Sequence, residues 1–129
     1  MSNDHAANLE AKLEGILRRH DELAQRMASA SGDAYMALAR EFAEIDALAG
    51  SIQALRATRQ EARGLEEMLA DSALDAEMRA LAQGELEALE ARLPGLEQEV
   101  RLALLPRDEA DAKSAILEIR AGKIGRAHV

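Results

Sequence analysis

The sequence has no cysteine and only two aromatic residues, Tyr35 and Phe42, in 129 positions. The missing cysteines exclude disulfides and thiol chemistry, and they suit a reducing cytosol. No apolar run approaches the roughly 18 residues that a membrane-spanning helix needs. The first residues also lack the basic and apolar regions of a signal peptide. We therefore expect a cytoplasmic protein without a membrane partner.

Basic residues are also scarce: 16 Lys and Arg face 24 Asp and Glu, which gives a net charge of −8. Such a surface disfavours nonspecific binding to a phosphate backbone, so a protein partner or one local basic patch is expected. What is abundant is Ala, Leu, Glu and Arg, a mixture that favours long helices. The length fits a single domain with a slim core, and elongated antiparallel helices suit it best.

Apolar residues recur at steps of three and four along three stretches, the pattern of one helix face. They predict helices over about residues 4–28, 34–70 and 75–104. Gly50 marks a bend or a break in the second helix, and Pro94 predicts a kink in the third. The predicted stripes are Leu9, Leu13, Ile16, His20, Leu23 and Met27, then Leu38, Phe42, Ile45, Leu48, Ile52, Leu55, Thr58, Ala62, Leu65 and Leu69, then Met78, Ala82, Leu86, Leu89, Leu93, Leu96 and Val100.

The helix ends carry their own signals: Asp33, and Ser72 or Asp75, are the predicted caps of the second and third helices. The third helix should stop at Pro106, before a charged connector. Residues 115–120, Ala-Ile-Leu-Glu-Ile-Arg, then predict a short β-strand with nothing in the chain to pair with. The expected fold class is all-α: an elongated antiparallel helical hairpin or bundle of three to four long helices, followed by an orphan β-strand from the next domain.

Candidate chemistry is sparse. The Glu-x-x-His pairs that hold two metals in helical bundles are missing. His20 lies on the first stripe and is interpreted as a packing residue with its ring tip near solvent. The acidic groups fit a solvated helix face better than paired catalytic carboxylates. These groups are Glu66 and Glu67, and Glu85, Glu87 and Glu90. We predict no catalytic, cofactor-binding or metal-binding residue.

Two arginine groups leave alternatives open: a local RNA contact, or ordinary surface arginines. The second is favoured because acids surround both groups. Pairs four residues apart are predicted to support the helices, and three methionines are interpreted as core filler. The first arginine group is Arg18 and Arg19, and the second is Arg56, Arg59 and Arg63. The pairs are Glu14–Arg18, Glu22–Arg26, Asp75–Arg79 and Glu97–Arg101. The methionines are Met27, Met68 and Met78.

A family resemblance rests mainly on the end of the chain. The run Leu104-Leu105-Pro106-Arg107-Asp108, then Asp111, then Ala-Ile-Leu-Glu-Ile-Arg-Ala-Gly over 115–122 resembles the junction of bacterial class I peptide chain release factors. That family reads Leu-Leu-Pro-Lys-Asp-Pro-x-Asp, an apolar strand, and Arg-Ala-Gly-Thr-Gly-Gly-Asp-Glu-Ala. Residues 38–45 are similar to its Leu-Ser-x-Glu-Tyr-Ala-x-Leu pattern. The resemblance covers roughly residues 9–122, and Glu109 departs from it where the family often has Pro.

The resemblance implies translation termination: a factor that binds the ribosome at UAA and UAG codons and promotes release of the polypeptide from peptidyl-tRNA. It further implies that this helical domain points toward the stalk base of the large subunit, while later domains contact rRNA and mRNA. The decoding tripeptide and the Gly-Gly-Gln motif are absent from this sequence, so we expect a non-enzymatic fragment without cofactor or small-molecule ligand. The alternative is a stand-alone coiled-coil adaptor for protein–protein contacts, which would not need the junction at 106–122.

The resemblance stops after Gly122, where the chain reads Lys-Ile-Gly-Arg-Ala-His-Val. These seven residues back-translate to AAGATCGGAAGAGCACACGTC, which looks like a common sequencing adapter. The predicted organisation is therefore an amino-terminal helical domain over 1–106, a connector and first strand of the following release-factor domain over 107–122, and a non-native tail over 123–129.

Overall fold

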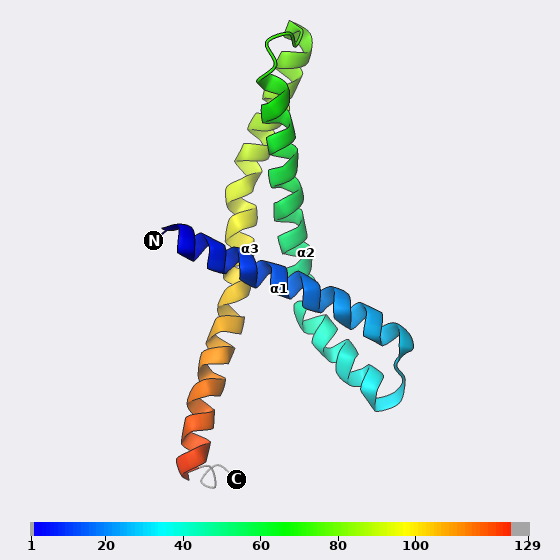
Figure 1. Cartoon of the computed structure of the whole chain (residues 1–129), viewed down its shortest axis with the longest axis vertical. Helices are drawn as coiled ribbons and strands as arrows, with labels where there is room; N and C mark the ends of the chain where they lie inside the picture. Colours follow the sequence, from blue (N-terminus) through cyan, green and yellow to red (C-terminus); the bar gives the residue numbers. More distant parts are fainter. Residues whose placement is uncertain (1, 125–129) are drawn as a thin grey trace.

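The chain folds as three long helices. The computed structural model describes the backbone of residues 2–124 and the side chains of residues 6–105. Within that backbone lie α1 (Ser2–Ser29), α2 (Gly32–Leu69) and α3 (Ala76–Ile124) (Figure 1). The all-α prediction is confirmed. No helix among the described residues has the length and hydropathy of a membrane span.

The turn between α1 and α2 is short and depends on a glycine. Gly32 has a φ of 60°, a left-handed conformation that is strained for residues with a Cβ atom. Ser31, with extended backbone, takes the N-cap position of α2, and its side chain makes no capping hydrogen bond. The predicted cap, Asp33, lies instead in the first turn of α2. There its negative charge is favourable for the helix dipole.

The turn between α2 and α3 is closed by its own polar groups. The Asp75 carboxylate accepts a hydrogen bond of 2.8 Å from the Glu77 amide, which confirms Asp75 as the cap of α3. The Asp71 carboxylate accepts one of 2.9 Å from the Ala73 amide. From across the turn, the guanidinium of Arg79 donates to the Leu69 carbonyl at 2.9 Å and to the Asp71 carbonyl at 2.8 Å. These bonds hold the turn in one shape.

The central core forms where all three helices meet. Helix α2 packs against both α1 and α3, and α1 runs across the α2–α3 pair in Figure 1. We call this the crossing region and define it by its cluster of buried residues. Each fully buried Leu or Ile in the cluster stabilises the fold by about 1.5–3 kcal/mol. The cluster comprises Leu13, Ile16, Leu48, Ile52, Leu55, Val100 and Leu104.

The predicted stripes place most of this core correctly. Every member of the cluster except Leu104 was on a stripe, and Leu23, Ile45, Thr58, Ala62, Ala82 and Leu89 are buried as well. Leu9 and Met78 are exceptions, because both are substantially exposed. Ala49 was not predicted but is completely buried.

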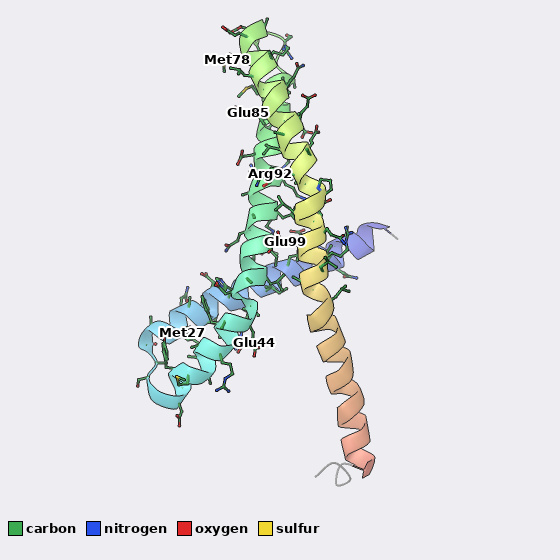
Figure 2. All side chains as sticks on the ribbon, turned by 180° about the vertical axis from the view of Figure 1, so that it is seen from behind. Met27, Glu44, Met78, Glu85, Arg92 and Glu99 are labelled. Atoms are coloured by element: carbon green, nitrogen blue, oxygen red, sulfur yellow. The ribbon has the colours of Figure 1, made fainter. Side chains whose placement is uncertain are left out.

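Helix α2 contacts both α1 and α3 because it changes direction along its length. Its first part runs beside α1 and its later part beside α3, and the change lies just beyond Glu44 (Figures 1 and 2). It is nevertheless one helix, so the alternative of a break at Gly50 is excluded. A Cβ atom at Gly50 would meet no other group within 4 Å, so the bend does not require glycine for close packing.

The predicted end of the helical region is wrong. Helix α3 continues through Pro94 and Pro106 to Ile124, so residues 115–120 are helical rather than a β-strand. The physical reason is that a strand needs a partner for its backbone groups, whereas a helix satisfies them internally. Each proline removes only one amide donor from the ladder, and the surrounding Ala, Leu, Glu and Arg favour helix.

Because α3 crosses residue 106 without interruption, the backbone does not mark the predicted domain boundary at that point. The division into 1–106, 107–122 and 123–129 remains a prediction. Residues 125–129 of the predicted non-native tail lie outside the described residues.

Candidate functional site

In the crossing region, arginines of α2 form ion pairs with both other helices. Arg56 reaches α1, where its Nη1 donates to Glu14 Oε1 at 2.7 Å and its Nη2 donates to Glu10. Arg59 reaches α3 and donates from Nη2 to Glu97 Oε2 at 2.8 Å. The hydrogen bond to Glu14 is the main reason why the pKa of Arg56 lies above its usual value. These ion pairs connect all three helices at the rim of the core.

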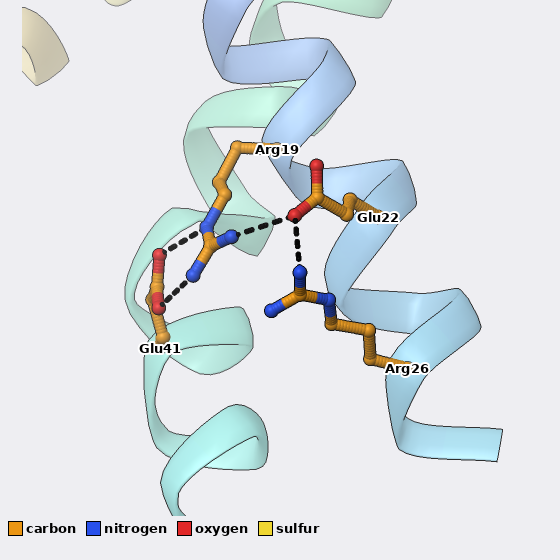
Figure 3. Close-up of polar contacts among 4 residues, drawn as sticks. All are labelled: Arg19, Glu22, Arg26 and Glu41. Carbon is orange, nitrogen blue, oxygen red and sulfur yellow. Dashed lines mark hydrogen bonds and ion pairs between the residues drawn. The ribbon is translucent and has the colours of Figure 1, made fainter. Parts of the chain in front are cut away.

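A second arginine ties α1 to the first part of α2. Arg19 binds the Glu41 carboxylate in a two-point contact, with Nε at 2.6 Å from Oε2 and Nη2 at 2.7 Å from Oε1. Its Nη1 donates to Glu22 at 2.9 Å, and Glu22 also pairs with Arg26 at 3.4 Å (Figure 3). Hydrogen bonding to Glu41 raises the pKa of Arg19.

These contacts bear on the two interpretations of the second arginine group. Arg56, Arg59 and Arg63 do line one open depression of about 530 Å³, together with Glu10 and Glu14. Arg56 and Arg59 are engaged by carboxylates there, and Arg63 donates to Gln60 at 3.0 Å. Two of the three arginines are thus engaged by carboxylates, which disfavours an RNA phosphate site and favours a structural role for Arg56 and Arg59.

The predicted pairs four residues apart are mostly replaced by contacts between helices. All four pairs lie within the described side chains, and of these Glu22–Arg26 forms an ion pair. Glu14 meets Arg56 instead, and Glu97 meets Arg59. Sequence spacing could not reveal these partners, because it carries no information on the register between helices.

His20 behaves as its position on the stripe predicts. Its ring stacks on Phe42 with centroids 4.6 Å apart, and Nε2 lies 2.7 Å from Asp46 Oδ1. The histidine thus packs against α2 while its ring tip reaches a polar partner. No group of three or more potential metal ligands occurs among the described residues.

The far end of the α2–α3 hairpin has a different character. We call residues 64–87 the hairpin tip. It carries seven acidic side chains and a single basic one, Arg79, whose guanidinium is directed to two backbone carbonyls. The acids predicted to be solvated, Glu66, Glu67, Glu85 and Glu87, are exposed, as is Glu90 just beyond the tip. No ion pair in the described part of the chain involves a carboxylate of the tip.

Apolar side chains are also exposed at the hairpin tip. Met68, Met78 and Leu81 have relative exposures of 41%, 45% and 60%. Figure 2 shows Met78 close to the end of the hairpin that is farthest from α1. The interpretation of Met68 and Met78 as core filler is therefore wrong, because the hairpin narrows to two helices here and cannot enclose them.

Comparison with known proteins establishes the family. The PCRF domain matches residues 15–127, almost the whole chain. The chain belongs to the PCRF-domain family of peptide chain release factors. It is 46% identical over 113 residues to a protein of Gluconacetobacter diazotrophicus named peptide chain release factor 1.

That match covers 87% of this chain but only 31% of the relative, so the chain spans about a third of the relative's length. No solved structure matches the chain. The family assignment confirms the resemblance seen in the junction residues. The crossing region and the hairpin tip are the structural features from which a role for this chain can be argued.

Proposed function

We propose that the chain is the amino-terminal part of a cytoplasmic translation termination factor that binds the ribosome at UAA and UAG codons and promotes polypeptide release. The observation that supports this most strongly is the 46% identity to a protein named peptide chain release factor 1, over 87% of the chain. The family junction at Leu104-Leu105-Pro106 supports the same proposal.

In this proposal the chain itself carries out no chemistry. Its sequence contains no Gly-Gly pair and therefore no Gly-Gly-Gln motif. Its contribution is to dock the factor at the stalk base of the large subunit. The shape supports this, because a long hairpin fixed at the crossing region extends well beyond the core (Figure 1). The rRNA and mRNA contacts belong to the later domains.

A chimeric factor tests the proposal. Residues 1–122 of this chain would replace the matching segment of the Gluconacetobacter relative, and peptide release would be measured on ribosomal complexes halted at UAA, UAG and UGA. We expect the chimera to release peptide at UAA and UAG about as fast as the relative and clearly faster than the relative lacking the segment. A chimera no faster than that truncated factor would contradict the proposal. The codon assignment is tested with the natural full-length protein rather than the chimera. Release by that protein at UGA but not at UAG would contradict the assignment.

A further inference from the structure

The exposed apolar residues of the hairpin tip lie on one face. Leu69 of α2 is half-buried and Ala82 of α3 is buried, so both point toward the partner helix. Met68 and Leu81 each precede one of these inward positions by one residue, a turn of about 100° around the helix. In two antiparallel helices these opposite turns bring both side chains to the same side. Met78 lies three residues from Leu81 and adjoins it. We call Met68, Met78 and Leu81 the tip face.

The tip face lies next to a turn that is held by hydrogen bonds. Arg79 joins the end of α2 to the start of α3 through the Leu69 and Asp71 carbonyls, and Asp75 caps α3. A surface that is already ordered loses little entropy when it binds, which favours docking. Methionine side chains add adaptable apolar contact area, a property common at binding surfaces.

The negative charge of the hairpin tip favours a partner with basic side chains. Seven acidic side chains against one arginine give residues 64–87 most of the net charge of −8 that the whole chain carries. A negative field of this kind repels nucleic acid phosphates and attracts lysine and arginine side chains. A second copy of the chain would bring an equally acidic tip and is disfavoured for the same reason.

We propose that the tip face docks onto a basic protein surface in which an apolar side chain is surrounded by lysines or arginines. The apolar partner would sit against Met68, Met78 and Leu81. Glu77 and Glu85, each one helical turn from Leu81 and exposed, would face the basic rim. This inference rests on the proposed function to the extent that the partner is a protein of the large ribosomal subunit. It adds which surface of this chain binds and the chemistry of the surface that receives it.

Two pairs of variants separate the tip from the rest of the surface. M78S/L81S removes apolar area from the tip face, and M36S/L102S removes exposed apolar side chains elsewhere. E77K/E85K reverses two charges next to the tip face, and E44K/E99K makes the same change of net charge at exposed positions outside the hairpin tip. Circular dichroism would verify that all four variants keep the helical content of the parent chain.

Binding of the 129-residue chain and its variants would be measured against purified bacterial large ribosomal subunits and, separately, against protein-free large-subunit rRNA. We expect the parent chain and both controls to bind the subunits alike. Both tip variants should bind about tenfold more weakly or worse, as for residues at the centre of an interface. Protein-free rRNA should not bind any of them.

The outcomes distinguish the two proposals. If the parent chain does not bind large subunits, the proposed docking role fails, and this inference fails with it. If the parent binds but the tip variants bind equally well, the tip face is not the contact, and the proposed function is unaffected. Equal binding of the parent to protein-free rRNA would show that the receiving surface is RNA and would overturn the assignment to a basic protein.

Discussion

The crossing region and the hairpin tip share α2 and α3, but only the crossing region includes α1, and the two regions use charge in opposite ways. In the crossing region the carboxylates Glu10, Glu14 and Glu97 are matched by Arg56 and Arg59, so charge joins helices around a buried cluster. The hairpin tip carries seven acids together with exposed methionines and a leucine, and these acids form no ion pair in the described structure. The comparison indicates that α1 secures one part of the hairpin and leaves the other available for binding.

Burial explains why the two regions should differ in stability. Three helices can enclose a core around α2, whereas two helices alone leave one side of each open to solvent. Changes in the crossing region should therefore alter the free energy of unfolding, and changes at the hairpin tip should alter binding. The predictions below run from the largest expected effect to the smallest.

The core of the crossing region should be the most sensitive site. Ile52 is completely buried at the centre of the cluster, so Ile52→Ala should lower the free energy of unfolding by about 2–5 kcal/mol. The matched change at the hairpin tip, Leu81→Ala, should cost less than about 0.5 kcal/mol because the side chain is mostly exposed. Urea unfolding followed by circular dichroism would measure both. Equal losses would mean that the hairpin tip is enclosed in the folded protein.

The turn that leads into α2 should come next. Gly32 has a positive φ, so Gly32→Ala should destabilise the fold by about 1–2 kcal/mol through backbone strain. Space is not the cause, since a Cβ atom there meets nothing within 4 Å. Thermal unfolding of this variant against the parent chain would test the effect. An unchanged Tm would show that the turn adopts another conformation in solution.

The arginine contacts of the crossing region should have a smaller effect. Arg56→Met should lower stability by about 0.5–1 kcal/mol, since the pairs with Glu10 and Glu14 are partly exposed to solvent. Arg92→Met, on an exposed part of α3, serves as the control and should change stability by less. Urea unfolding in low and high salt would measure the difference, which should shrink as salt screens the pairs.

The pKa of Arg56 sets the pH dependence of this effect. The pKa is raised in the folded state, so the stabilisation is fully present below the ordinary arginine value and is lost only as the pH rises through the raised pKa. The cost of Arg56→Met should therefore be the same at about pH 6 and about pH 9. A cost that falls markedly between these values would show that another titrating group controls the contact.

The last expected effect is a gain, similar in size to the loss at Arg56. Gly84 lies within α3 at the hairpin tip, and a Cβ atom there meets nothing within 4 Å. Gly84→Ala should raise the free energy of unfolding by about 0.5–1 kcal/mol, because alanine loses less backbone entropy on forming a helix. The midpoint of urea unfolding would report it. A lower midpoint would indicate a packed neighbour at this face of the hairpin.

Much of the fold follows from the sequence, because helical periodicity is a local signal. The spacing of Leu13 and Ile16 in α1, and of Leu48, Ile52 and Leu55 in α2, predicted correctly which face of these helices is buried. Asp75 indicated the start of α3. The resemblance at the junction also led to the correct family. These features depend on residues a few positions apart, where physical rules are reliable.

What the sequence did not reveal depends on contacts between distant residues. Pairing of Arg56 with Glu14 requires the register of α1 on α2. Exposure of Met68 and Met78 requires knowing that α1 does not reach the tip of the α2–α3 hairpin. The strand expected at 115–120 was inferred from apolar and β-branched composition, but α3 continues through it. The acidic excess of residues 64–87 was present in the sequence and would have been found by counting charge along each segment.

Hydrogen–deuterium exchange on the free chain, repeated with bound large ribosomal subunits, most directly tests the claim that the crossing region holds the fold while the hairpin tip binds. We predict that amides of residues 45–62 exchange most slowly in the free chain, because the buried residues of α2 concentrate there. Binding should add protection within residues 64–87 and little elsewhere. Added protection confined to the crossing region, or slower exchange at the hairpin tip than at residues 45–62 in the free chain, would contradict the account.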